Sequence, residues 1–185
     1  MAEPRDRYST VSILLHWTIA ALILTNVWFG WQMDEAKGLE KFQLFQTHKS
    51  VGLTVLLLSL ARLGWRIANP APPLPAHMAR WEKLVARATH VALYVLMIGV
   101  PLFGWASVSA SPLNIPTEFW GVVPWPHLPL PHSKALSHQL GEVHVALVLS
   151  TFAVLALHVA GALKHQFVDR DEVLWRMLPI VGRPR

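Results

Sequence analysis

The chain has 185 residues, of which 53% are hydrophobic and only 15% are charged, whereas ordinary soluble domains carry about 25% charged residues. It contains no cysteine, which excludes disulfides, thiolate metal sites, iron–sulfur clusters and covalent c-type haem attachment. The net charge of +5 would suggest a nucleic-acid partner in a soluble protein, but the basic residues flank apolar blocks. We therefore expect no nucleic-acid partner and read the charge as a signal of membrane orientation.

Four apolar blocks predict four membrane-spanning helices. Each block is about 20 residues long, which is the length of helix needed to cross a hydrocarbon core of about 30 Å. The first block is too long for the apolar region of a cleavable signal peptide, so we expect it to be retained. The sequence thus predicts an all-α integral membrane four-helix bundle, formed by the single domain 1–185 in contact with lipid, with helices at approximately 11–33, 45–67, 88–108 and 143–163.

The connectors differ in character. A polar loop joins the first two blocks, and the segment 69–75 (NPAPPLP) ends the second helix, because proline has no N–H and restricts the residue before it. Pro101 predicts a kink within the third helix. The long loop 109–141 is rich in proline and tryptophan, and tryptophan prefers the membrane interface. We expect this loop to lie as a lid on the bilayer surface.

The distribution of lysine and arginine predicts the orientation. Twelve of the sixteen lie in the N-terminal head, the second connector, the C-terminal tail or the Arg62/Arg66 pair, and the four others lie on the opposite side. Cytoplasmic segments carry an excess of basic residues. We therefore expect both termini in the cytoplasm and the loop 109–141 outside.

Histidines within the apolar blocks are the main functional signal, because an ionisable side chain in a membrane is costly to bury. His144 and His158 are 14 residues apart, which places them on one helix face about 21 Å apart along the axis. They cannot share one metal ion. By depth in the membrane, His16 matches His158 near the cytoplasmic side, and His48 matches His144 near the outer side.

Two such pairs fit the axial ligands of two b-type haems, since bis-histidine haems are commonly held in helix bundles. A histidine hydrogen-bonded across helices is the structural alternative for any one of the four. Zinc is another possibility, but the apolar blocks contain no Asp or Glu, so a two-histidine zinc site would be incomplete.

Further candidates lie near the expected cytoplasmic side. Arg62 and Arg66 could pair with haem propionates, since arginine suits carboxylates, or could anchor the helix at the interface. His90 is a candidate quinone contact or an interhelical hydrogen-bonding group. His165 is the rival for the inner iron ligand, seven residues after His158, and otherwise a candidate quinone or propionate contact or an interfacial group.

Several motifs carry a resemblance to a known family. They are L-L-H-W, T-H-K-S-V-G, A-R-L-G-W-R with N-P-A-P-P-L-P, T-H-V-A-L-Y, V-P-L-F-G-W and the ending H-V-A-G-A-L-K-H-Q-F-V-D-R-D-E-V-L-W-R-M-L-P. From about Tyr8 to Pro179 the chain resembles the prokaryotic cytochrome b561 family. The resemblance implies a four-helix bacterial inner-membrane protein with two b haems, whose iron ligands fall on His16, His48, His144 and His158.

The resemblance also implies a function. We expect transmembrane electron transfer through the two haems, with exchange of electrons with the quinone pool and ubiquinone as a bound partner. Some members are superoxide:ubiquinone oxidoreductases, in which case Lys49 and Lys134 are candidate attractors of the anion. One alternative is a haem-bearing anchor subunit that connects a dehydrogenase or cytochrome partner to the membrane. A non-redox transporter is a further alternative, although it would usually need acidic groups or broken helices within the membrane.

Overall fold

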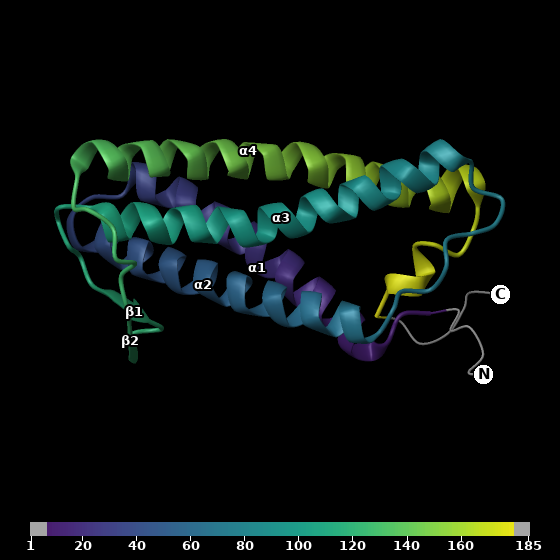
Figure 1. Cartoon of the computed structure of the whole chain (residues 1–185), viewed down its shortest axis with the longest axis horizontal. Helices are drawn as coiled ribbons and strands as arrows, with labels where there is room; N and C mark the ends of the chain where they lie inside the picture. Colours follow the sequence, from purple (N-terminus) through teal and green to yellow (C-terminus); the bar gives the residue numbers. More distant parts are fainter. Residues whose placement is uncertain (1–6, 180–185) are drawn as a thin grey trace.

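Four long helices run side by side along the long axis of the molecule (Figure 1). The computed structural model describes residues 7–179, and its helices are α1 (Thr10–Glu35), α2 (Gly38–Ala68), α3 (Arg80–Ala110) and α4 (Lys134–Lys164). All four are long and apolar enough to cross a membrane. The expected all-α membrane four-helix bundle is therefore confirmed.

The two ends of the bundle carry different connections. At the hairpin end, which holds Glu35, Gly38, Ala110 and Lys134, a short hairpin of β1 (Thr117–Phe119) and β2 (Val123–Trp125) follows α3. At the tail end lies the C-terminal segment with η1 (His165–Asp169), a π-helical turn, and η2 (Trp175–Met177). Both the first and the last described residues lie at the tail end, where the Tyr8 amide donates to the Arg176 carbonyl.

Each helix is longer than the apolar block that predicted it. The largest corrections are the start of α2 at Gly38 instead of 45, of α3 at Arg80 instead of 88 and of α4 at Lys134 instead of 143. The bilayer limits the apolar length of a helix but not its polar ends, where side chains can cap the backbone. The Ser133 hydroxyl accepts a hydrogen bond from Leu136 N–H, and the Glu82 carboxylate accepts one from Ala79 N–H, as helix N-termini require.

The connector at the hairpin end is correspondingly shorter than the predicted 109–141, since α3 ends at Ala110 and α4 begins at Lys134. Its hairpin packs against α2. Ser50, which is buried, accepts a hydrogen bond from the Trp120 amide and donates to the Glu118 carbonyl, and Trp120 Nε1 donates to Thr54 Oγ1. The connector is thus fixed to α2, and it is fixed to α3 as well, where Trp105 Nε1 donates to the Pro126 carbonyl and Ser109 Oγ accepts from the Leu128 amide.

Helix packing divides the bundle unevenly. The most extensive helix–helix contacts are those of α3 with α4 and of α1 with α2, and α2 also packs against α3. Within residues 7–179, α4 shares no extensive backbone contact with α1 or α2. The central core is small and consists of Ile19, Val55 and Met97 from three helices, with Tyr94 among the side chains packed on it.

Candidate functional site

One histidine pair lies towards the tail end. His16 is six residues after the start of α1, and His158 is six residues before the end of α4. Their ring centroids are 6.2 Å apart, although the two helices share no extensive backbone contact in the described part of the chain. The two imidazoles therefore face each other across a separation between α1 and α4.

A second pair lies towards the hairpin end. His48 and His144 are each ten residues after the start of their helices, α2 and α4. Their ring centroids are also 6.2 Å apart. The structure thus brings together the same two pairs that depth in the sequence predicted, one above the other along α4.

The separation within each pair suits a metal ion between the rings. A bond from an imidazole nitrogen to a metal is about 2 Å long. Two such bonds in line, with half of each ring added, place the ring centroids about 6 Å apart, compared with the observed 6.2 Å. The paired rings also connect α4 to α1 and α2, with which it shares no extensive backbone contact in the described residues.

Backbone carbonyls orient the imidazoles of the hairpin-end pair. His48 Nδ1 lies 3.0 Å from the Asn26 carbonyl oxygen, and His144 Nδ1 lies 2.8 Å from the Val100 carbonyl oxygen. A carbonyl can only accept, so the proton is on Nδ1 and the lone pair is on Nε2. A metal-binding histidine usually donates its other ring N–H in this way.

Glycines make room for these two rings, and sequence reasoning did not single them out. A Cβ added at Gly104 would lie 3.0 Å from His144 Nδ1, and one at Gly30 would lie 3.7 Å from His48 Cε1. Gly104 belongs to the V-P-L-F-G-W segment, one of the motifs that carry the family resemblance. This motif was the signal in the sequence that could have pointed to Gly104. Its lack of a side chain lets α3 and the His144 ring pack closely.

The tail-end pair has a third imidazole beside it. The His90 ring centroid is 5.2 Å from that of His158, and His90 Nδ1 lies 2.7 Å from the Ala86 carbonyl oxygen of its own helix. His16 Nδ1 is buried and has no hydrogen-bond partner among residues 7–179. An unpaired buried nitrogen is costly, and His16 differs in this respect from His48 and His144, whose Nδ1 atoms each have a carbonyl partner.

The two arginines lie beside the tail-end pair at a small pocket. The Arg62 guanidinium lies 5.7 Å from the centroid of the Tyr94 ring, and Arg62 and Arg66 both line the pocket together with Tyr8, Ser12, Asn69 and Met177. Two half-buried guanidinium groups here can bind carboxylates. Both arginines, the predicted propionate contacts, thus lie at the tail end of the bundle.

His165 lies in a different environment from the four paired histidines. It is buried in η1, and its Nδ1 lies 2.7 Å from a carboxylate oxygen of Asp171. Burial raises the pKa of Asp171, but hydrogen bonds from the Val173 amide and from His165 outweigh this effect and hold the pKa below its ordinary value. His165 is thus associated with carboxylates of the tail, whereas His158 faces His16.

Lys49 and Lys134, the candidate attractors of an anion, both lie at the hairpin end, but the Lys49 ammonium is engaged by the connector. The Lys49 ammonium donates to the Pro116 carbonyl at 2.9 Å and lies 4.7 Å from the centroid of the Phe45 ring. Lys134 is the first residue of α4. Lys49 therefore fixes the connector to α2.

Comparison with known proteins agrees with this arrangement. The family model described as prokaryotic cytochrome b561 matches residues 7–179. The chain belongs to this family. It is accordingly a membrane haem protein, and the family implies b-type haem, for which the paired imidazoles and the separation between α4 and the α1–α2 pair are suitable.

Individual relatives match over nearly the whole chain. "Cytochrome b561 homolog 2" of Escherichia coli (strain K12) is 30% identical over 176 residues, covering 94% of this chain and 92% of the relative. "Cytochrome b562" of Cereibacter sphaeroides is 29% identical, covering 96% of each chain. "Probable superoxide oxidase CybB" of Yersinia pestis is 25% identical over 181 residues, covering 94% of this chain and 96% of the relative.

Proposed function

We propose that this cytochrome b561 protein carries electrons across the bacterial inner membrane between two b haems and exchanges them with the quinone pool. His16 and His158 would hold the tail-end haem, and His48 and His144 the hairpin-end haem. The observation that carries the proposal is the equal spacing of the two pairs, 6.2 Å in each. Their separation along α4, about 21 Å for 14 residues, would place the haems near opposite membrane faces.

The chain's own residues would do distinct work around the haems. The Asn26 and Val100 carbonyls fix the rings of His48 and His144, and the buried core of Ile19, Val55 and Met97 would separate the two haems. Haem supplies reversible one-electron chemistry at its iron, with a potential set by axial ligands, burial and hydrogen bonds. Arg62 and Arg66 would bind propionates of the tail-end haem.

The orientation proposed is tail end inward. The excess of lysine and arginine at that end supports cytoplasmic termini, so the tail-end haem would lie near the cytoplasm. We propose that quinone is reached from this haem, with His90 as one candidate contact and His165 as the other through its second ring nitrogen, since Asp171 holds Nδ1. The close approach of His90 to His158, 5.2 Å between centroids, supports a role for His90 next to the inner iron.

Haem counting in single variants tests the ligand assignment. Wild-type protein purified in detergent should contain about two b haems per chain with low-spin spectra. His48→Ala and His144→Ala should each lose the same haem, and His16→Ala and His158→Ala the other. Loss of both haems in all four variants, or loss of a haem in His165→Ala but not in His158→Ala, would contradict the pairing.

Control variants separate ligands from neighbours. His90→Ala removes the imidazole next to His158, and we expect it to retain both haems with at most a shifted spectrum of one of them. His138→Ala changes an exposed histidine at the hairpin end and should leave both spectra unchanged. If His90→Ala loses one haem while His16→Ala retains two, His90 is the ligand in place of His16.

Superoxide oxidation coupled to ubiquinone reduction is the more specific candidate. It is supported by the relative from Yersinia pestis that is named a probable superoxide oxidase. Isolated protein should then reduce ubiquinone when superoxide is supplied, and His48→Ala should abolish this turnover. Haem-loaded protein that is inactive alone but is reduced by a bound dehydrogenase or cytochrome would instead be an anchor subunit.

A further inference from the structure

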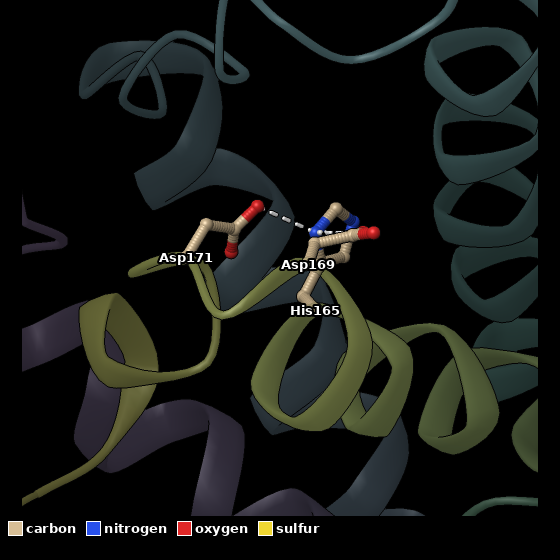
Figure 2. Close-up of side chains that lie close together, drawn as sticks. All are labelled: His165, Asp169 and Asp171. Carbon is tan, nitrogen blue, oxygen red and sulfur yellow. Dashed lines mark hydrogen bonds and ion pairs between the residues drawn. The ribbon is translucent and has the colours of Figure 1, made fainter.

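A second group of potential metal ligands lies at the tail end, outside the two histidine pairs. Its donor atoms come from His165, Asp169 and Asp171 in the segment after α4, shown in Figure 2, and lie within 4.8 Å of one another. His77 from the α2–α3 connector contacts Asp171. His77 and Asp171 are 94 positions apart in the chain. The fold therefore joins two separate segments at this point.

The local backbone brings the donor atoms together. The π-helical turn η1 ends at Arg170, which has a left-handed backbone conformation with φ of 53°. This reversal directs the carboxylates of Asp169 and Asp171 towards the same ring nitrogen, His165 Nδ1 (Figure 2). The Val173 amide donates to the other oxygen of Asp171 and fixes that side chain.

The spacing of the donors resembles that of a tetrahedral metal site. Ligand atoms at about 2.0 Å from a tetrahedral zinc ion lie about 3.3 Å from one another. His165 Nδ1 is 3.3 Å from Asp169 Oδ2, and His77 Nε2 is 3.3 Å from Asp171 Oδ2. His165 Nδ1 and Asp171 Oδ2 lie closer together, at 2.7 Å, in a hydrogen bond that would lengthen on metal binding.

The burial of the ligands and their access from solution also suit a metal site. The side chains of His165 and Asp171 are 11% and 10% exposed, whereas that of His77 is 61% exposed. His165 and Asp171 are thus held within the structure, and the exposed side of the group, at His77, can admit an ion from solution. A metal site needs both fixed ligands and an entry path.

We propose that His165, Asp169 and Asp171 form a binding site for a divalent transition-metal ion of the zinc class, which His77 would complete from its place beside Asp171. One imidazole nitrogen and two carboxylate oxygens, with a second imidazole next to them, suit Zn²⁺, whereas Mg²⁺ and Ca²⁺ prefer sites made only of oxygen. The site is separate from the haem ligands. Metal bound here would connect the tail to the α2–α3 connector.

Lys164 provides a sharp test because it competes for one ligand. Its ammonium group contacts Asp169 at 2.6 Å and Glu82 at 2.8 Å. An incoming cation would displace the Lys164 ammonium from Asp169. Glu82 would still hold the ammonium. Lys164→Met should therefore tighten metal binding. Replacement of a lysine that contacts no metal ligand would leave metal binding unchanged.

The experiment is equilibrium dialysis of full-length, haem-loaded protein against Zn²⁺, with the metal measured by mass spectrometry and with a purification tag free of histidine. We expect one tight Zn²⁺ per chain. Asp171→Asn and His165→Ala should each weaken binding at least about tenfold, and His77→Ala should weaken it to a smaller or equal extent. His138→Ala, which removes an exposed histidine paired with Glu142, is the matched control and should bind normally.

The haem spectrum shows whether each variant is folded, so loss of zinc can be separated from loss of structure. No tight Zn²⁺ in the wild type would overturn the proposal. Zinc retained in Asp171→Asn, or lost equally in His138→Ala, would overturn it as well, because the ion would then be bound elsewhere. None of these results depends on which electron donor or acceptor the cytochrome uses.

Discussion

At the scale of single residues, glycine and backbone carbonyls determine how the hairpin-end imidazoles are held. The Val100 carbonyl lies 2.8 Å from His144 Nδ1, and Gly104, one turn further along α3, leaves the space that the ring occupies. The ring cannot move away from α3 without losing that hydrogen bond. Gly104, which would not contact the haem iron, can therefore control the position of His144, a proposed iron ligand.

Gly104→Ala tests this control. The added Cβ would lie 3.0 Å from Nδ1 and 3.1 Å from Cε1 of His144, and such overpacking costs about 1–3 kcal/mol. We expect the haem content to fall from about two towards one, with loss of the same spectrum as in His48→Ala. Gly64→Ala is the control, since no atom lies within 4 Å of its added Cβ; equal haem loss in both variants would point to a general effect on folding.

At the scale of elements, the hairpin is held by its contacts with α2. Trp120, at the turn between the strands, has φ of 54°, which costs a residue with a side chain about 1–2 kcal/mol. The Ser50 hydroxyl accepts from its amide, and Thr54 accepts from its indole nitrogen. The unfavourable turn is therefore stabilised by the helix on which it packs.

Ser50→Ala should release the hairpin while leaving the helices in place. The Trp120 amide would lose its acceptor in a partly buried position, at a cost of about 1–3 kcal/mol. We expect faster hydrogen exchange at residues 117–125, with both haem spectra retained. Ser150→Ala, which removes only a bond to the Ala146 carbonyl of its own helix, should leave the exchange of the hairpin unchanged.

At the scale of the whole molecule, α4 is packed mainly on α3. Among residues 7–179 it contacts α3 closely but has no extensive backbone contact with α1 or α2. Its links to these helices include the paired histidines, His158 with His16 and His144 with His48. Haem bound in both pairs would fill the separation between the two halves of the bundle.

Removal of haem should therefore destabilise the bundle unevenly. Protein produced under haem limitation should have a lower melting temperature, because a ligand that binds only the folded state stabilises it. Hydrogen exchange should increase most in α4 and least between α1 and α2. Equal protection of α4 with and without haem would show that the α3–α4 contact alone is sufficient to hold α4 in the bundle.

The membrane orientation can be tested directly because the chain has no cysteine. Val122, 81% exposed in the hairpin turn, and Ala76, exposed in the α2–α3 connector, are suitable positions for a single cysteine. A membrane-impermeant maleimide should label Val122→Cys in cells with a permeable outer membrane, and Ala76→Cys only after lysis. The reverse pattern would place the tail end outside.

The sequence by itself determined the number of crossings and the four paired histidines, since both depend on local properties. An apolar block of about 20 residues must cross the membrane, and the position of a histidine within its block sets its depth. The polar ends were underestimated: α2, α3 and α4 begin seven to nine residues before the predicted positions. Hydropathy marks where lipid ends and does not mark where hydrogen bonding of the helix ends.

Only the tertiary structure decided which groups meet across long stretches of chain. The Val100 carbonyl reaches His144 over 44 positions, and His77 reaches Asp171 over 94. Sequence periodicity cannot reveal such contacts, because they depend on which helix faces pack and on the turn at Arg170. The pairing by depth could be predicted since the membrane aligns the helices along one axis, whereas the glycines, carbonyls and tail carboxylates required the packed structure.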